Sequence, residues 1–202
     1  LSVAAHEWGV EVVAFDMDSQ RVANAKAAEF DPAEPGVVDF LREVGDRYVV
    51  TEESRELQDC DVVIIAVDTA LQETGEIDDA EVSEHLRVVA AAVSASSPVV
   101  LARQVRPGFT HAHREIHSEL YYFMETLVFG RGIERAQCPE RYIIGSPQPE
   151  VPLPSGLRDY LALAGCPVHV MSYESAELTK LSANVVLAAS ITAANSLAEL
   201  AE

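Results

Sequence analysis

The sequence predicts an α/β fold of the Rossmann-like, doubly wound type, with a mostly parallel sheet followed by a long C-terminal helix. Short apolar runs alternate with helical segments, which is the pattern of a parallel sheet wrapped by helices. The run at residues 12–15 is wholly apolar, as expected of a strand buried on both faces, and it ends at the acid Asp16. From Glu174 to the end of the chain the pattern is helical.

Each expected element follows from its local pattern of apolar residues and turn residues. The expected strands lie at 11–16, 48–51, 61–67, 98–102, 121–123 (buried), 142–145 and 168–170. The expected helices are one stopped by Gly9, one from 19 to about 30, one at 37–43, a short one at 52–57, one at about 80–95, one after 110, one at 156–164 and the final helix.

Composition limits the class of protein. The chain has 202 residues, 49% of them hydrophobic, and a net charge of −19. Such a charge repels nucleic acid and anionic membranes, so we expect neither as a partner. We find no signal peptide and expect no apolar run of membrane-spanning length. Three widely spaced cysteines favour a reducing compartment, and we expect the cytoplasm.

The two ends of the chain suggest a piece of a longer protein. The sequence begins at Leu1, inside a helical pattern, and ends at Glu202 within another. A phosphate-binding glycine loop would precede this first helix, and it is not in the sequence. We therefore expect the first strand and the glycine loop of a dinucleotide fold to lie before Leu1.

Asp16 is the first candidate binding residue. It follows an apolar strand and precedes a helix, the position at which dinucleotide-binding folds place an acid that accepts two hydrogen bonds from a ribose. The alternative is that Asp16 merely caps the next helix. The loops after Asp16, Val67 and Ala102 are expected to open on one edge of the sheet, where open α/β sheets bind ligands.

Six motifs, taken in order, extend this interpretation. They are Gly9 to Val13 with Asp16-Met17-Asp18; Glu34-Pro35-Gly36; Asp61 to Val67 with Thr69; Gln104 to Thr110; Glu125, Leu127 and Gly130 with Pro139 to Gly145; and Glu174 to Lys180 with Asn184. At these separations they resemble the UDP-glucose/GDP-mannose dehydrogenase family. The resemblance covers nearly the whole chain and implies an NAD-binding domain at residues 1–172, then the start of a central helical dimerisation and linker domain at 173–202.

The resemblance implies an activity and partners. Members oxidise the C6 alcohol of a nucleotide sugar, such as UDP-glucose, to a uronate for polysaccharide synthesis, using two NAD+. A nucleotide-sugar substrate, NAD as cofactor, no metal, and a homodimer formed through the C-terminal helix are therefore expected. The thiol nucleophile and the sugar-binding domain would lie beyond Glu202, so this piece alone is expected to be inactive.

The same resemblance implies a role for each matching residue. Asp16 would bind the adenosine ribose, and Arg21 would lie near that ribose or the pyrophosphate. Thr69 and Gln104 would contact the cofactor on its nicotinamide side. In the reacting centre, Glu125 would belong to an acid–base and water network, and Lys180 and Asn184 would hold the oxygen on C6.

Lys180 and Asn184 also have a physical interpretation of their own. Four residues apart on a helix, they share a face, so an ammonium and an amide can donate to one oxygen. An alkoxide or tetrahedral oxyanion needs donors fixed in advance. Lys180 and Lys26 are the only lysines, and the surrounding helix is unusually apolar. The alternative is that Lys180 is a solvated helix lysine and Asn184 its polar neighbour.

Departures from the family pattern keep other functions open. Gln104 and Phe109 replace threonines, Met124 replaces a proline, and Phe129 stands where many members have a glutamate. One alternative is an enzyme like the β-hydroxyacid dehydrogenases, which also pair a nucleotide-binding domain with a Lys-x-x-x-Asn helix. The other is a non-catalytic nucleotide-binding homologue.

Three histidines resemble a metal-binding set only superficially. His113 and His117 are expected on one face of a solvated helix, with His111 pointing elsewhere. No convergent carboxylate accompanies them, so we expect no metal site there.

Overall fold

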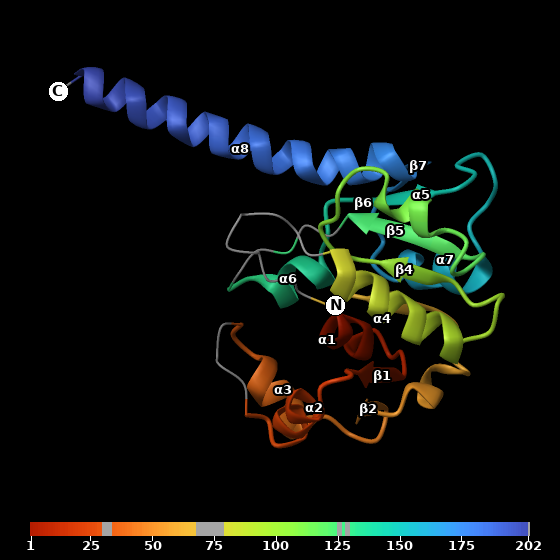
Figure 1. The fold of residues 1–202 in the computed structure, drawn as a ribbon. Helices are drawn as coiled ribbons and strands as arrows, with labels where there is room; N and C mark the ends of the chain where they lie inside the picture. Colours follow the sequence, from red (N-terminus) through yellow and green to blue (C-terminus); the bar gives the residue numbers. More distant parts are fainter. Residues whose placement is uncertain (30–33, 68–78, 125–126, 128–129, 202) are drawn as a thin grey trace.

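The chain was analysed as a computed structural model, which describes residues 1–29, 34–67, 79–124, 127 and 130–201 (Figure 1). The strands are β1 (Val12–Phe15), β2 (Tyr48–Thr51), β3 (Val63–Ile65), β4 (Val99–Leu101), β5 (Leu120–Met124), β6 (Tyr142–Ser146) and β7 (Val168–Ser172). The helices are α1 (Ser2–Glu7), α2 (Ser19–Lys26), α3 (Val37–Glu43), the 3₁₀-helix η1 (Ser54–Leu57), α4 (Asp79–Ala92), α5 (Phe109–His113), α6 (Gly132–Gln137), α7 (Ser155–Ala162) and α8 (Tyr173–Ala201).

The strands form two hydrogen-bonded groups. β1 and β2 pair in parallel, and the second group has the order β3-β4-β5-β6-β7. All its pairs are parallel except β5 with β6. This arrangement confirms the predicted mostly parallel, Rossmann-like sheet.

Helices cover both faces of the larger sheet because alternate strand residues feed two separate cores. Val99 and Leu101 of β4 pack with Leu86 of α4 and with the start of α8. Val100, between them, packs with α1 and α7 on the other face, against residues such as Leu157. A strand buried on both faces has no solvent side, which explains its continuous apolar sequence.

Helix α2 is shorter than its sequence pattern predicts. It ends at Lys26, not near Phe30, because Ala28 takes a left-handed φ of 53°. The Ala28 amide donates to Ala25 O at 3.1 Å and the Glu29 amide to Asn24 O at 2.8 Å. These two bonds form a Schellman-type end that closes the last turn.

The expected long helix after Thr110 is also shorter. α5 ends at His113, with Arg114 as its C-cap. His117 lies outside this helix, is 5% exposed, and has its Nε2 2.7 Å from the Ser97 carbonyl oxygen. The prediction that His113 and His117 share a solvated helix face is therefore wrong.

Helix α8 has a buried beginning and a long exposed remainder that extends away from the sheet (Figure 1). Its first turn packs on β5 and β6: a Cβ added to Gly145 would lie 3.1 Å from Tyr173 Cα and 3.2 Å from Ala176 Cβ. By length and composition alone α8 could cross a membrane, so the expectation that no apolar run reaches that length is wrong. The same composition suits a helix covered by another protein chain.

Candidate active site

Asp16 lies at the carboxyl end of β1, beside the end of β2. Its amide donates to the Thr51 carbonyl oxygen at 3.2 Å, one residue past the last paired position. The N-cap of α2 is Asp18, whose Oδ1 accepts from Gln20 N at 2.8 Å and Arg21 N at 3.3 Å. The alternative in which Asp16 caps this helix is therefore wrong, and its carboxylate has no role in the helix end.

Neighbouring groups orient the Asp16 carboxylate without covering it. Oδ1 accepts from the Asp18 amide at 2.9 Å, and Oδ2 lies 3.7 Å from Nη1 of Arg21. The Asp16 side chain keeps 32% of its surface exposed. The structure thus brings together the two residues expected at the ribose and leaves the carboxylate able to accept hydrogen bonds.

Gln104 and Asn184 form a second pair, drawn from distant parts of the chain. Asn184 Nδ2 donates to Gln104 Oε1 at 3.0 Å across 80 residues of sequence. β3 and β4 end level with each other, with Ile65 opposite Leu101, so Gln104 stands just past this edge of the sheet. An amide nitrogen carries two N–H groups, so Asn184 keeps one for another acceptor.

Lys180 lies on α8, the helix that also carries Asn184. It is half-buried, three residues after Glu177 and four before Asn184. That spacing places all three side chains on one side of α8. Thr69 and Glu125, the remaining predicted site residues, lie outside the described residues, as does Phe129.

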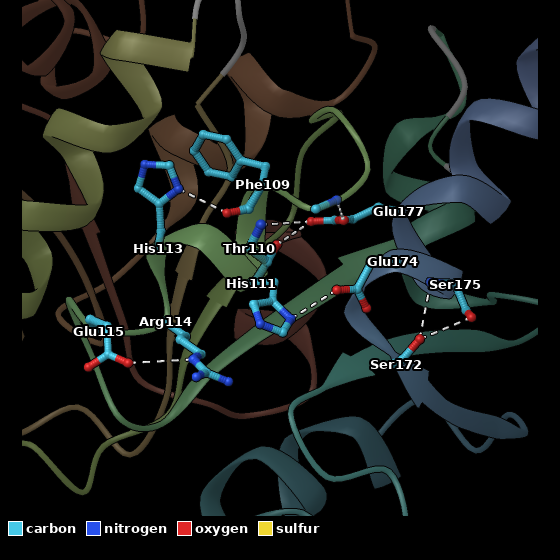
Figure 2. A network of polar contacts seen from close by, with 11 residues as sticks. Phe109, Thr110, His111, His113, Arg114, Glu115, Ser172, Glu174, Ser175 and Glu177 are labelled. Atoms are coloured by element: carbon cyan, nitrogen blue, oxygen red, sulfur yellow. Dashed lines mark hydrogen bonds and ion pairs between the residues drawn. The ribbon is translucent and has the colours of Figure 1, made fainter.

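Glu177 is a site residue that sequence reasoning missed. It is 1% exposed and accepts from Gly108 N at 2.6 Å, Thr110 N at 2.8 Å and Thr110 Oγ1 at 2.6 Å. Figure 2 shows its carboxylate pointing from α8 into the start of α5. Its position inside the Glu174-to-Lys180 motif was the available signal.

A second contact between α5 and α8 lies at the surface. His111 Nδ1 is 2.9 Å from Glu174 Oε1, and both side chains are about half exposed (Figure 2). Solvent weakens such a pair, so it contributes little to holding the two helices together. The buried Glu177 is therefore the principal polar link.

Glu34 makes a comparable link elsewhere and was also missed. Its Oε1 accepts from Gly132 N at 2.7 Å and its Oε2 from Gly130 N at 3.0 Å. A Cβ on Gly132 would lie 3.1 Å from this carboxyl group, so the carboxylate packs closely on the backbone there. The Glu34-Pro35-Gly36 motif thus holds the backbone at Gly130 and Gly132.

The Asp16–Arg21 pair and the Gln104–Asn184 pair are separate groups. No hydrogen bond or ion pair between described residues joins Asp16 or Arg21 to Gln104 or Asn184. In Figure 1, β1 and α2 lie on the side of the molecule opposite α8.

None of the cysteines lies in either pair, and all three are free thiols. Burial, with Asp61 and Asp59 nearby, raises the pKa of the Cys60 thiol. A raised pKa is the opposite of what a thiol nucleophile needs. Within the described ranges, no group of three histidine, cysteine or acidic side chains is arranged to hold a metal ion.

The doubly wound sheet, with an oriented carboxylate after β1 and a polar cluster after β4, is the arrangement of a Rossmann-type dinucleotide-binding domain. A model of the NAD-binding domain of the UDP-glucose/GDP-mannose dehydrogenase family matches residues 1–152. The chain belongs to the UDP-glucose/GDP-mannose dehydrogenase family, and it is an NAD-binding domain.

Individual relatives agree with this assignment. The chain is 31% identical over 212 residues to UDP-glucose 6-dehydrogenase of Pseudomonas aeruginosa, a match that covers 96% of this chain and 46% of the relative. It is 26% identical to UDP-glucose 6-dehydrogenase 5 of Oryza sativa, covering 96% and 44%. The structure of a UDP-glucose dehydrogenase from Pyrobaculum islandicum matches with a TM-score of 0.81 at 25% identity, covering 97% and 48%.

The chain spans about half the length of the curated relatives it matches, between 44% and 49% for the first three. The family match also decides between two of the interpretations above. It favours the nucleotide-sugar dehydrogenases over enzymes like the β-hydroxyacid dehydrogenases.

Proposed function

We propose that this chain is the NAD-binding part of an enzyme that oxidises the C6 alcohol of a nucleotide sugar, of the UDP-glucose kind, to a uronate for polysaccharide synthesis. The observation that carries the proposal is the Asn184–Gln104 hydrogen bond, which holds the proposed donor helix against a loop at the ligand edge of the sheet. Family membership supports the same reaction class.

Asp16 is proposed to bind the adenosine ribose of NAD. Two vicinal hydroxyl groups need an acceptor with two oxygens, and Asp16 offers a partly exposed carboxylate already oriented by Asp18 N and Arg21. Arg21 stands beside it, close enough to reach the ribose or the pyrophosphate. Since Asp18 caps α2, ligand binding at Asp16 requires no change in the helix end.

Lys180 and Asn184 are proposed to hold the oxygen on C6. When bound, NAD+ supplies the hydride acceptor for each oxidation. The Lys180 ammonium and the free N–H of Asn184 would donate to the alkoxide, and later to the tetrahedral oxyanion of the second oxidation. Donors fixed before the reaction stabilise such charge at no reorganisation cost.

Thr69, Gln104 and Glu125 complete the proposed site. Thr69 and Gln104 would contact NAD on its nicotinamide side, where Gln104 already meets the donor helix. Glu125 would take part in the acid–base and water network. Among the described residues, Glu34 binds the backbone amides of Gly130 and Gly132, further along the chain.

The domain proposal places residues 1–172 in the NAD domain and 173–202 in a helical linker, with a strand and glycine loop preceding Leu1. The separation of β1 and β2 from the five-stranded sheet supports the proposed preceding strand. Phe15 of β1 and Ile65 of β3 pack against one core, yet no ladder joins their strands. A further parallel strand between them would complete the sheet and lead into α1.

The exposed part of α8 is proposed to form a homodimer interface. Val185, Val186, Leu187 and Ile191 are each more than half exposed. An apolar stripe of this size is normally covered by a partner. Because the three thiols are free and the cofactor is NAD, we propose a cytoplasmic protein.

The test uses the complete protein that contains this chain, with UDP-glucose and NAD+ in excess. Lys180→Ala is expected to reduce turnover by about 100-fold or more, as removal of an oxyanion donor does. Lys26→Ala, the change at the other lysine, on the exposed side of α2, serves as the matched control. Normal turnover of Lys180→Ala would refute the donor role. NAD binding with no turnover of the unmutated protein would favour a non-catalytic homologue.

A further inference from the structure

We propose that Glu177 is a positioning residue that sets the register between the 104–110 loop and the donor pair on α8, and that turnover depends on this register. The inference rests on the proposed function, because it concerns the placement of Lys180 and Asn184 relative to Gln104. The proposed role of Glu177 requires no contact between Glu177 and the cofactor or the substrate.

The contacts of Glu177 are unusual for a carboxylate buried this deeply. Its partners among the described residues are the neutral donors Gly108 N, Thr110 N and Thr110 Oγ1. Burying a charge is costly unless it is well satisfied, and no cation is among these partners. An acid at this position therefore needs an explanation beyond packing.

Only a carboxylate fits this set of donors. It accepts through both oxygens, whereas the amide of glutamine has one accepting oxygen and a nitrogen that donates. Glu177 uses one oxygen for Gly108 N and the other for both donors of Thr110. With glutamine, at least one of these donors would face another donor and lose its partner.

Two contacts attach the loop to α8 at its two ends. Asn184 holds the loop start through Gln104 at an exposed position, and Glu177 holds the loop end at a buried one. The two helix residues are seven apart, so the contacts are separated by about 10 Å along the axis. Attachment at two separated points fixes both the axial position and the rotation of α8 against the loop.

Lys180 lies between the two attachment points. The position of its ammonium relative to the 104–110 loop therefore depends on how α8 is placed against that loop. Loosening the buried attachment would displace Lys180 and Asn184 together without removing either. A misplacement of about 1 Å can reduce a rate by roughly 100-fold.

The experiment compares Glu177→Gln, Thr110→Val and the double variant in the complete protein, with Glu174→Gln as the matched control. Glu174 lies one turn earlier on α8 and binds only at the surface. Turnover, the KM for the nucleotide sugar, and the deuterium isotope effect on C6 are measured. NAD binding stoichiometry and thermal unfolding report on folding.

We expect Glu177→Gln to lower turnover by about 10- to 100-fold. The KM for the sugar should change less than threefold and the isotope effect should rise, because hydride transfer becomes slower in every molecule. Thr110→Val should cause a smaller loss, and the double variant should lose less than the product of the two. Partial unfolding would instead lower the NAD stoichiometry and leave KM and the isotope effect unchanged, which would overturn the proposal.

The two proposals fail differently. If Lys180→Ala abolishes turnover while Glu177→Gln keeps it within twofold, the positioning role is wrong and the proposed function stands. If Lys180→Ala keeps normal turnover, the proposed function itself fails. If Glu177→Gln does not fold, Thr110→Val decides: an unchanged turnover and isotope effect in that variant overturn the positioning role.

Discussion

Asn184 donates to the side-chain oxygen of Gln104 at 3.0 Å, although the two residues are 80 positions apart. The contact joins the long C-terminal helix to the loop after β4. Each residue was predicted separately for a different end of the reaction, Gln104 for the cofactor and Asn184 for the substrate oxygen. Their contact supports a single site and leads to a direct test.

The Gln104–Asn184 contact is expected to couple the two residues energetically. Gln104→Ala and Asn184→Ala should each lower turnover of the complete protein, and the double variant should lose less than the product of the single losses. Contacting residues typically couple by about 0.5–3 kcal/mol. Steady-state kinetics of all four proteins measure the coupling, and strictly multiplicative losses would show that the contact has no functional role.

Asp16→Asn is expected to weaken NAD+ binding. Hydrogen bonds to a charged group contribute about 1.5–3 kcal/mol, so the dissociation constant should rise by roughly 10- to 100-fold. Asp18→Asn is the matched control, because asparagine still caps a helix and Asp18 holds α2. Titration calorimetry on the complete protein measures both. Equal affinities for the Asp16 variant and the unmutated protein would contradict the ribose assignment.

Gly145→Ala is expected to destabilise the domain. The added Cβ would meet Tyr122 Cβ at 3.0 Å and the beginning of α8 at 3.1 Å. Overpacking of this kind costs about 1–3 kcal/mol. Gly45→Ala is the control, since a Cβ there meets no atom within 4 Å. Urea unfolding compares the two, and equal midpoints would contradict the close packing of α8 on β6.

Glu34→Gln is expected to loosen the backbone at Gly130 and Gly132. The amide can satisfy only part of the Gly130 and Gly132 donors, which an acceptor-only carboxylate now binds. Hydrogen exchange at these two amides should accelerate, by about tenfold for each 1.4 kcal/mol of weakened protection. Glu43→Gln, at the exposed end of α3, is the control. An unchanged exchange rate in the Glu34 variant would show that the Glu34 carboxylate does not protect these two amides.

Val186→Asp is expected to separate the proposed homodimer. Val186 is 64% exposed on α8, and a buried unpaired charge at an interface is strongly unfavourable. Val151→Asp, at a 50% exposed valine in a surface segment, is the control. Light scattering gives the mass of each protein. A monomeric unmutated protein would refute the dimer, and its flotation with lipid vesicles would indicate that α8 binds a membrane instead.

The sequence alone determined the layered architecture. Short continuous apolar runs between helical segments are typical of strands buried on both faces, and the observed cores on the two sides of β4 confirm that prediction. The motifs also identified the family, because their order and spacing can be seen in the sequence without the folded structure. The roles of the seven predicted site residues stay predictions, with Thr69 and Glu125 outside the described residues.

The tertiary structure decided which polar side chains stabilise the fold and which remain accessible to a ligand. Asp16 and Asp18 look equivalent in the sequence, but it is Asp18 that accepts hydrogen bonds from the amides at the start of α2, and Asp16 keeps 32% of its side chain exposed. Glu177 and Glu34 lie inside two of the motifs, but the motifs do not reveal what their carboxylates bind. Whether a carboxylate meets water or backbone donors 67 or 98 residues away depends on long-range packing, which local sequence does not encode.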